Sequence, residues 1–508
     1  MHKTKTDKRP NAHRARLGTL YPFLFAVHPV LYLFSINRDE APAGQVIRPA
    51  LVALAGTGLI YLLLRAVLKN SAKAAAVTAL AVLYFWLCRP ICEIAYGSKV
   101  FGLTFGRTSI LAPAMGICVA AGAALLVRSR SSLERMTRFL NAFGIVLMAF
   151  TLINIVSYNI SSRAGMASLD RWRTGVAGEF AGGRVNLPAS NIPRRNVYYI
   201  ILDMYARDDA LKRDYGYDNK AFTDYLRSKG FYVARQGRSN YLYTHISLGS
   251  LLNMDYVQPV LKSAGLRPTE RTFLAMNRTN KLFGLMKAAG YRVVYLPPEG
   301  YVFLEAPNAD QVKASSGLGL SDFERALVLD SLLHPVAVAA YDHRRHVLDE
   351  FAELENIPAA PTFTFAHILC PHPPYVFDAQ GGRVANPSSP ETRSRLYTNQ
   401  LAYVNKRVEG MIDRILSESK TPPVIVIQSD HGTWLGPGNL RSSGVLLACY
   451  FPDGGGKRLY PTVTSVNAVR TMLDYYFGMS YPRLPDVSYQ QKLDGGEYSF
   501  REVEAVQK

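Results

Sequence analysis

The sequence predicts two unlike parts: an all-α transmembrane domain of five helices, then an α/β domain whose mostly parallel sheet is flanked by helices. Three observations support this division of the 508 residues. Long apolar runs dominate the chain up to about Ser157. From Asn196 onward, short β-rich runs alternate with helical stretches, the pattern of a layered α/β fold. Acidic and imidazole side chains follow several β-rich runs, where open parallel sheets bind their ligands.

The first part holds five apolar runs, each about 20 residues long, which is enough to cross a bilayer. A buried core helix would explain any single run. Five runs in succession, separated by short charged loops, favour membrane spans instead. The runs are Leu17–Ile36, Pro49–Leu68, Ala74–Ile91, Ser109–Val127 and Phe139–Ser157.

The charges of the connecting loops predict the orientation of these helices. The N-terminal segment is strongly basic, and the second and fourth loops carry more Lys and Arg than the first and third. The positive-inside rule therefore places the N-terminus in the cytoplasm, and five crossings place everything after Ser157 on the other side. The net charge of +19 then reflects topology signals and contacts with anionic lipids. Because no zinc-finger or RRM signature is present, we expect no nucleic-acid partner.

The chain divides into four predicted segments: a transmembrane domain over 1–157, a linker over 158–193, an extracytoplasmic domain over 194–485 and a polar tail over 486–508. The linker is rich in Gly, Ser, Ala and Arg, and its SLDRWR stretch is interpreted as an interfacial helix. The predicted strands are 197–203, 231–235, 291–297, 362–369, 424–430 and 445–451. The predicted helices include 219–230, 280–290 and 399–419, and the first two end in Gly, a C-cap signal.

The five cysteines do not form a disulfide framework. Three of them fall in or near the membrane part, and only Cys370 and Cys449 lie in the exported part, each at the end of a strand-like run. We interpret these two as buried free thiols. An oxidising compartment would permit a bridge if their strands are neighbours.

Two acidic segments follow predicted strands. Asp203 comes directly after the run VYYIIL, and Asp430 and His431 come after VIVIQS. Helix capping is a structural alternative for each Asp. Carboxylate and imidazole are also good ligands for one divalent ion, Zn²⁺ or Mn²⁺, with Mg²⁺ as a further option.

A pair of histidines lies in TFTFAHILCPHPPYVF. His367 and His372 are five residues apart and would face opposite sides of a straight strand, but Pro371 ends that strand and frees His372 to turn back over the sheet edge. One buried and one surface histidine is the structural alternative. Functionally, the pair would bind a phosphate or sulfate oxygen, or His372 would act as general acid to a leaving group.

The segment THISLGS offers a nucleophile. A Thr hydroxyl such as that of Thr244 attacks only when a metal or a base lowers its pKa. At helical spacing, Thr244, Ser247 and Ser250 would form one polar stripe at the start of a helix, where anions bind well. Plain N-capping by Thr244 is the structural alternative.

The order of these motifs makes the exported part, from about Asn196 to Tyr481, resemble the sulfatase-like branch of the alkaline phosphatase superfamily. The resemblance is closest to membrane-anchored lipoteichoic acid synthases and lipid A phosphoethanolamine transferases, which also join five transmembrane helices to an extracytoplasmic catalytic domain. The matching segments are IILDMYAR, THISLGS, HILCPHPPY and SDHG. SDHG is the most specific match, and THISLGS is the least.

The resemblance implies a role for each site residue. One divalent metal would be held by Asp203, Thr244, Asp430 and His431, with Thr244 as the nucleophile.

The remaining positions are implied to meet the substrate. His367 and His372 would contact substrate or a second metal, with His372 also catalytic, and Tyr375 and Arg207 would bind substrate.

The implied activity is transfer of a phosphoglycerol- or phosphoethanolamine-type head group from a phospholipid donor to a glycan or lipid acceptor, through a phosphothreonine. The implied location is the bacterial cytoplasmic (inner) membrane, with the catalytic domain periplasmic.

The sequence also departs from these families. It lacks the C-x-P-x-R motif of true sulfatases, and it has no His beyond His431. The missing C-x-P-x-R motif disfavours sulfate-ester hydrolysis. The missing further His argues against a two-metal site, which favours one metal, and against phosphoethanolamine as the specific head group. A phosphodiesterase or sulfatase-like hydrolase of the same fold remains the alternative activity, and a non-catalytic membrane scaffold is the alternative from another class.

Overall fold

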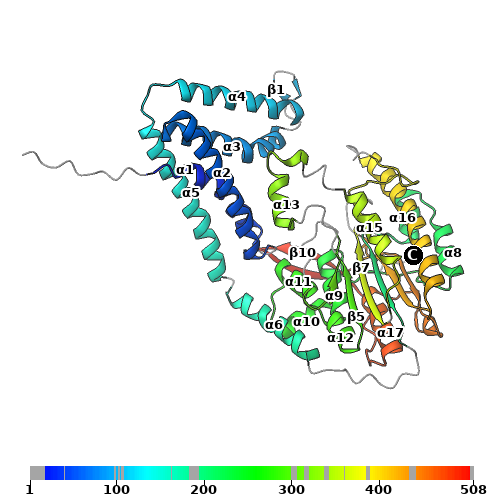
Figure 1. The fold of residues 1–508 in the computed structure, drawn as a ribbon. Coiled ribbons are helices and arrows are strands. Elements are labelled where there is room, and N and C mark those ends of the chain that lie inside the picture. The colour runs from blue at the N-terminus through cyan, green and yellow to red at the C-terminus, as the bar shows by residue number, and fades with distance from the viewer. Residues whose placement is uncertain are drawn as a thin grey trace, which may run out of the picture. The chain divides into compact units, whose positions relative to one another are not determined.

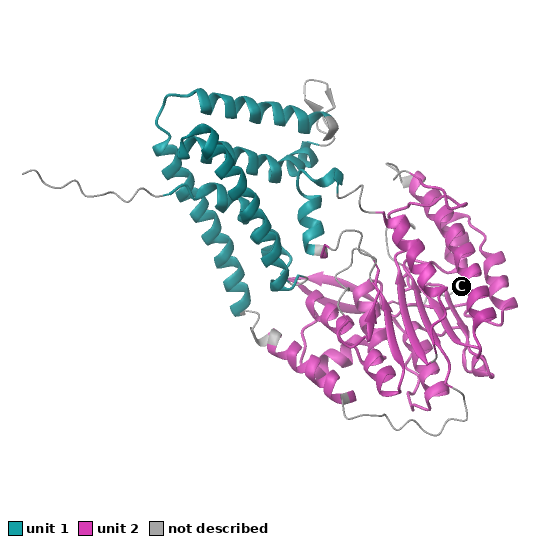
Figure 2. Cartoon of the chain, in the orientation of Figure 1, with its two compact units in different colours: residues 1–160, 323–339 teal, residues 161–322, 340–508 magenta. Residues whose placement is uncertain are grey.

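The computed structural model divides the chain into two compact units, which are coloured separately in Figure 2. Unit 1 comprises 1–160 and 323–339, and unit 2 comprises 161–322 and 340–508. The described residues are 18–38, 41–95, 99–100, 103–104, 108–161, 163–181, 194–298, 306–313, 320–336, 342–359, 361–384, 390–433 and 442–503.

Unit 1 is built mainly from apolar helices, and every predicted apolar run falls on one of them. Within the described ranges, four segments are long and apolar enough to cross a membrane, namely Ala43–Leu68, Ser71–Ala95, Ile110–Arg128 and Glu134–Ile160, and α1 is a shorter apolar helix. The elements are α1 (Tyr21–Ile36), η1 (Ala43–Val46), α2 (Ile47–Leu68), α3 (Ser71–Ala95), β1 (Lys99–Val100), β2 (Leu103–Thr104), α4 (Thr108–Arg128) and α5 (Glu134–Ser161).

The first and last of these helices run in the same direction. At their starts, the amide of Tyr21 donates to Oδ1 of Asn141 over 2.9 Å. At their ends, Arg38 donates to Oδ1 of Asn154 over 2.8 Å and lies over the ring of Tyr158. The ends of α1 and α5 are therefore on one side of the unit.

A segment far along the chain also belongs to unit 1. Helix α13 (Asp322–Leu329) buries Phe323 and Leu327 against Val30. Its Glu324 forms an ion pair with Arg48 of α2. The sequence predicts one continuous extracytoplasmic domain over 194–485. That range is corrected, because 323–339 belongs to unit 1.

Unit 2 is organised around a seven-stranded sheet with the order β4-β9-β8-β3-β7-β5-β6. Figure 1 labels two of its strands, β5 and β7. Strand β3 is central and parallel to both β7 and β8, and β5 is parallel to β7 and β6. The pairs β8–β9 and β9–β4 are antiparallel, so β9 runs against the other strands described in this sheet. The strands are β3 (Val197–Leu202), β4 (Tyr232–Val233), β5 (Arg292–Leu296), β6 (Gln311–Val312), β7 (Thr362–Ile368), β8 (Val424–Gln428) and β9 (Leu447–Tyr450). The predicted α/β fold with a mostly parallel sheet is confirmed, as is each of the six predicted strands.

Helices cover both faces of this sheet (Figure 1), so its central strands read as continuous apolar runs. One core contains α9 (Thr244–Leu252), α12 (Lys281–Ala288) and α17 (Ser465–Phe477); the other contains α7 (Asp208–Tyr215), α8 (Lys220–Ser228), α15 (His343–Leu354) and α16 (Pro390–Glu418). Alternate residues of β3 enter the two cores, Val197, Tyr199 and Ile201 on one face and Tyr198, Ile200 and Leu202 on the other. The remaining helices are α6 (Arg163–Ala181), α10 (Val257–Ala264), α11 (Glu270–Arg278) and η4 (Gly455–Arg458).

The predicted linker contains a helix that belongs to unit 2. Leu169, Trp172 and Val176 of α6 share one helix face and are buried in a third core with Phe273. The interpretation of this stretch as an interfacial helix is therefore corrected: the spacing of its three apolar residues fits packing on the folded unit.

The predicted polar tail is also corrected. Strands β10 (Ser488–Asp494) and β11 (Glu497–Val503) form an antiparallel hairpin, whose turn is Gly495-Gly496, with φ of 56° and 84°. A Gly-Gly pair is a strong hairpin signal because both residues take positive φ readily. Tyr498 of the hairpin is buried in the third core.

Cys370 and Cys449 are both free and buried, as interpreted from the sequence. Cys449 lies on β9, whereas Cys370 follows β7, and β8 and β3 separate those strands. The bridge that the sequence leaves open therefore does not form.

Candidate functional site

Three predicted site residues meet at the carboxyl edge of the central strands. Ile201 of β3 is in register with His367 of β7 on one side and with Gln428 of β8 on the other. Asp203 and Asp430 each lie two residues beyond this level. Parallel pairing thus brings both acids and His367 to one edge of the sheet, where open α/β sheets bind ligands.

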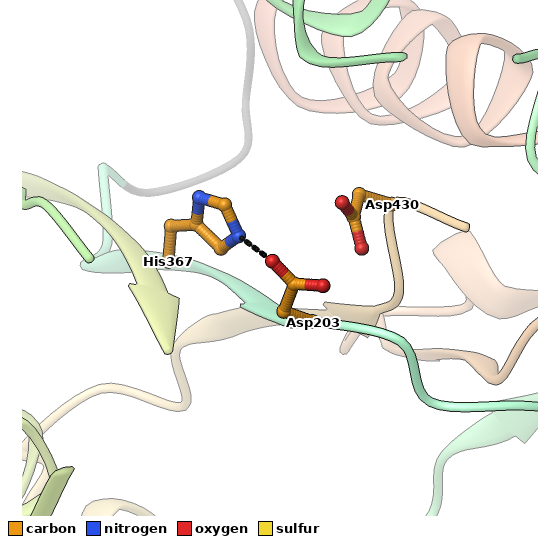
Figure 3. A group of neighbouring side chains, drawn as sticks. All are labelled: Asp203, His367 and Asp430. Atoms are coloured by element: carbon orange, nitrogen blue, oxygen red, sulfur yellow. Dashed lines mark hydrogen bonds and ion pairs between the residues drawn. The ribbon is translucent and has the colours of Figure 1, made fainter. Parts of the chain in front are cut away.

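The three side chains form a compact buried group. Asp203, His367 and Asp430 each offer a ligand atom within 4.8 Å of the others. Figure 3 shows them converging, with Nε2 of His367 3.1 Å from Oδ2 of Asp203. Each side chain is at most 1% exposed. The resemblance implies that His367 contacts substrate or a second metal, and the structure places it among atoms able to hold a metal.

His431 approaches the same two carboxylates. Its Nε2 lies 3.7 Å from Oδ1 of Asp203 and 3.5 Å from Oδ2 of Asp430, which is longer than a hydrogen bond. Its Nδ1 lies 2.8 Å from the carbonyl oxygen of Gly432, which can only accept, so Nδ1 carries a hydrogen. In the neutral ring, Nε2 then offers a lone pair, the form in which His binds metals.

Two buried oxygens at this point have no hydrogen-bond donor within the described part of the chain. They are Oδ1 of Asp203 and Oδ2 of Asp430, the atoms that His431 approaches. A buried carboxylate oxygen without a partner is costly. Two such oxygens beside an imidazole lone pair are a donor set suited to Zn²⁺ or Mn²⁺. The residues present therefore fit a divalent cation.

The backbone fixes the two acids relative to each other. The amide of Met204 donates to Oδ1 of Asp430 over 3.3 Å, and the amide of Tyr205 donates to Oγ of Ser429 over 2.8 Å. Met204 has φ of 63°, the left-handed region that a non-glycine residue rarely adopts. Such strain, on the order of 1–3 kcal/mol, persists where surrounding contacts enforce it, often at functional sites.

Thr244 is the first residue of a helix that docks on Asp430. Tyr243 is the N-cap of α9, so the alternative in which Thr244 merely caps the helix is not found. One turn later, Oγ of Ser247 donates to the carbonyl oxygen of Asp430 over 2.7 Å. Thr244 is 5% exposed, and the N-terminal turn of α9 therefore lies against the carboxyl end of β8.

The predicted polar stripe on α9 is divided in two. Ser247 bonds to the site, but Ser250 donates to the carbonyl oxygen of Asp255 over 2.6 Å, outside the site. The two serines therefore have different neighbours despite their helical spacing.

His372 lies close to the same group. Its amide donates to the carbonyl oxygen of Asp203 over 3.2 Å, and its Nδ1 donates to the carbonyl oxygen of Pro373 over 2.6 Å. Burial lowers the pKa of the His372 imidazole despite the nearby Asp203 carboxylate. For Asp203, burial alone would raise the pKa, but His372, His367 and His431 together hold it below its ordinary value. Asp203 is therefore a carboxylate.

His367 is shifted the other way. Burial alone would lower its pKa, but its hydrogen bond to Asp203 and the charges of Asp203, Asp430 and Glu350 raise it above the ordinary value. An excess of negative charge around the imidazole is the physical cause, and it is the same excess that suits a cation.

Two predicted substrate residues have other contacts. Arg207 pairs with Asp209 at 2.6 Å and donates to the carbonyl oxygen of Gly237 at 3.0 Å. Tyr375 is buried with its ring against Tyr397. Among the described residues, no hydrogen bond or ion pair joins either side chain to the buried group, so their substrate roles stay predictions.

Sequence reasoning missed three polar residues that hold this site: Ser429, Gln400 and Tyr397. Ser429 precedes Asp430 and could have been noticed as part of the SDHG segment. Gln400 and Tyr397 lie on α16, and Tyr397 donates to the carbonyl oxygen of Met204 over 2.9 Å. A polar residue on the buried face of a helix carries no local signal of what it contacts.

Comparison with known proteins gives one family and several solved structures. The family model described as sulfatase matches residues 195–468. No curated protein sequence matches the chain.

The solved structures are similar at low identity. The C-terminal periplasmic domain of EptC from Escherichia coli, in complex with Zn, is 16% identical, with 58% of this chain and 86% of that chain covered and a TM-score of 0.39. The integral membrane protein lipooligosaccharide phosphoethanolamine transferase A from Neisseria meningitidis is 13% identical, with 91% and 94% covered and a TM-score of 0.36. Phosphonate monoester hydrolase of Agrobacterium radiobacter is 13% identical, with 60% and 82% covered and a TM-score of 0.40.

Proposed function

Because the chain belongs to the sulfatase family, we propose that it is a membrane-anchored, metal-dependent transferase that moves a phosphorylated head group from a phospholipid to a glycan or lipid acceptor. The observation that carries this proposal is the pair of buried carboxylate oxygens on Asp203 and Asp430, which face His431 and have no hydrogen-bond donor among the residues that the structure describes. The head group is of the phosphoglycerol or phosphoethanolamine type.

The metal ligands in this proposal are Asp203, Thr244, Asp430 and His431, with His367 hydrogen-bonded to Asp203. A divalent cation held there would lower the pKa of the Thr244 hydroxyl and neutralise charge on the phosphoryl oxygens. The protein groups orient that chemistry: Met204 and Ser429 fix the Asp430 carboxylate by hydrogen bonds.

The nucleophile is the hydroxyl oxygen of Thr244. Its position at the start of α9 supports this role, because the amide groups of a helix N-terminus favour an anionic phosphoryl group. In the first step, the Thr244 oxygen bonds to phosphorus while the bond from phosphorus to the diacylglycerol oxygen breaks. The proton lost by Thr244 is delivered to the diacylglycerol oxygen through His372.

In the second step, the hydroxyl oxygen of the acceptor bonds to phosphorus and the Thr244 oxygen leaves. The acceptor's proton returns through His372 to Thr244, so the enzyme ends as it began. The main-chain bond from His372 to Asp203 supports a position for this imidazole beside the reacting atoms.

The apolar helices of unit 1 support a phospholipid as the donor substrate. These helices suit a membrane anchor, and the parallel arrangement of α1 and α5 is that of two spans crossing in the same direction. With the basic N-terminus in the cytoplasm, the end of α5 leads unit 2 to the periplasmic side of the inner membrane. Phospholipid head groups and glycan acceptors are available there.

Release of diacylglycerol tests this function. The purified, metal-loaded full chain is incubated with labelled phosphatidylglycerol or phosphatidylethanolamine, with and without glycan and lipid acceptors. We expect the label to move to an acceptor. Transfer to water at the same rate with every acceptor would establish the hydrolase alternative, and no release from either lipid would contradict the proposal.

A further inference from the structure

The loop that carries His372 has more backbone hydrogen-bond acceptors than donors. The stretch Pro371-His372-Pro373-Pro374 contains three prolines, which have no N–H to donate. The only amide in this stretch, that of His372, is already used by the carbonyl oxygen of Asp203. The carbonyl oxygen of Pro373 accepts from Nδ1 of His372. The other carbonyl groups of this partly buried loop take their protein donors from elsewhere, because a buried carbonyl without a partner is costly.

Gln400 of α16 supplies that donor. Its Nε2 lies 3.2 Å from the carbonyl oxygen of Pro371, 3.0 Å from that of His372 and 3.5 Å from that of Pro374. The Gln400 side chain is fully buried. The two hydrogens of this amide group thus bind the carbonyl oxygens of Pro371 and His372, and the carbonyl oxygen of Pro374 lies at the limit of a hydrogen bond.

The other end of the same side chain holds the exit of the loop. Oε1 of Gln400 accepts from the amide of Val376 over 2.8 Å and from that of Phe377 over 3.3 Å. The Gln carboxamide presents two donors and one acceptor on one terminal group, one methylene farther from the helix than in Asn. The contacts therefore depend on the carboxamide itself, and a residue of equal size does not replace it.

From these contacts we infer that Gln400 is the positioning residue for His372. It does not touch the reacting atoms. It fixes the main chain of His372 from one side, while the carbonyl oxygen of Asp203 fixes the amide from the other side. This inference rests on the proposed function, in which the His372 imidazole carries protons between Thr244, the leaving oxygen and the acceptor. Small displacements of such a group are expensive for the rate.

The test is a double-mutant cycle on the metal-loaded full chain. Gln400→Leu and Gln400→Glu are each made in the wild type and in His372→Ala, and diacylglycerol release is measured. Gln400→Leu removes both bonding ends, whereas Gln400→Glu keeps the acceptor for Val376 and Phe377 and remains useful if the leucine variant does not fold.

We expect Gln400→Leu to lower kcat by about 10- to 100-fold in the wild type, the range found for residues that orient a catalytic group. In the His372→Ala background the same substitution should lower kcat less than about twofold, because the group that Gln400 orients is already absent. Gln400→Glu should lie between the wild type and Gln400→Leu. Equal losses in both backgrounds, or wild-type turnover by Gln400→Leu, would overturn the inference.

Asn196→Leu is the matched control. Asn196 is also a buried carboxamide that bonds in both directions, to the carbonyl oxygen of Pro358 and the amide of Thr362. It lies before β3, at the opposite end of the strand from Asp203. Asn196→Leu should lower thermal stability. Any change in kcat should be the same in the wild type and in the His372→Ala background.

Hydrogen exchange separates this inference from the proposed function. The amides of His372, Val376 and Phe377 should exchange faster in Gln400→Leu than in the wild type, whatever the protein's substrate. Faster exchange together with a wild type that releases no diacylglycerol would mean that the loop assignment holds and the proposed function fails. Unchanged exchange at His372 would overturn the inference while the proposed function stands.

Discussion

Nε2 of His367 lies 3.1 Å from Oδ2 of Asp203, and both side chains are fully buried. The bond connects a residue inside strand β7 with one just beyond the end of β3, across a pair of parallel strands. One oxygen of Asp203 is thereby held by His367, while its other oxygen faces His431 and has no donor in the described part of the chain. His367 therefore orients a proposed metal ligand, in the way that outer groups commonly support metal sites.

His367→Ala should weaken metal binding without abolishing it. The bond that orients Asp203 is lost, but the proposed ligands remain, so affinity should fall about 10- to 100-fold. Titration of the metal-free full chain with Zn²⁺ or Mn²⁺ measures this. His334→Ala is the control, because His334 bonds to Leu329 in unit 1. An unchanged affinity in His367→Ala would show that the bond has no role at the site.

Removal of two ligands together should abolish the metal site. In Asp430→Ala/His431→Ala, Asp203 alone remains of the three groups that face one another. Metal content after purification should drop to background, and turnover should fall by several orders of magnitude because metal and nucleophile act as a unit. Elemental analysis of the purified chain decides this, and a stoichiometric metal in the double variant would refute the ligand assignment.

The two serines of α9 should respond differently to substitution. Ser247→Ala removes the bond that docks α9 on Asp430, so diacylglycerol release should drop together with about 1 kcal/mol of stability. Ser250→Ala removes a bond of similar length to Asp255 and should cost comparable stability with no loss of turnover. Thermal unfolding and release assays on both variants make the comparison. Equal turnover in the two would mean that docking of α9 does not matter to the site.

A buried carboxyl behind the site should make stability depend on pH. Glu350 and His346 of α15 are each 3% exposed and lie 3.4 Å apart. Burial raises the pKa of Glu350 above its ordinary value, an effect that His346 only partly offsets. Because the folded pKa is the higher one, this carboxyl supports folding fully below its ordinary pKa of about 4.5, and that contribution is lost as pH rises through the folded pKa.

Glu350→Gln should therefore unfold at a higher temperature than the wild type at pH 8, and the difference should shrink as the pH falls toward 4.5. Thermal unfolding at several pH values measures the trend. A difference that is constant with pH, or that grows toward acid pH, would contradict the assigned direction of the pKa shift.

The strands and the site edge were predictable because their signals are local. An apolar run such as that of β3, which is buried on both faces, indicates a central strand. An acidic residue directly after such a strand lies at the edge of the sheet where ligands bind. The sequence therefore places Asp203, Asp430 and His431 at this edge, and their role as metal ligands stays a prediction. The left-handed φ of Met204 and the hydrogen bond of His367 to Asp203 depend on how the strands pair in three dimensions. The sequence alone therefore does not predict them.

The errors concern segments that look polar or uniform in sequence. The hairpin Ser488–Val503 was predicted as a tail because only a few residues, such as Tyr498, are buried. Helix α6 was predicted as interfacial because Trp172 is equally suited to a membrane surface and to a protein core. Gln400 illustrates a further limit, since its importance comes from the prolines of a loop that is distant in sequence.

The central claim is a covalent intermediate on Thr244, and mass spectrometry of the full chain tests it most directly. The metal-loaded protein is mixed with labelled phospholipid in the absence of acceptor, quenched and digested. The account predicts a phosphorylated head group on the peptide containing Thr244, less of it in Thr244→Ser, and neither adduct nor diacylglycerol release in Thr244→Ala. Diacylglycerol release by Thr244→Ala at the wild-type rate, with no adduct on the wild-type peptide, would contradict the account.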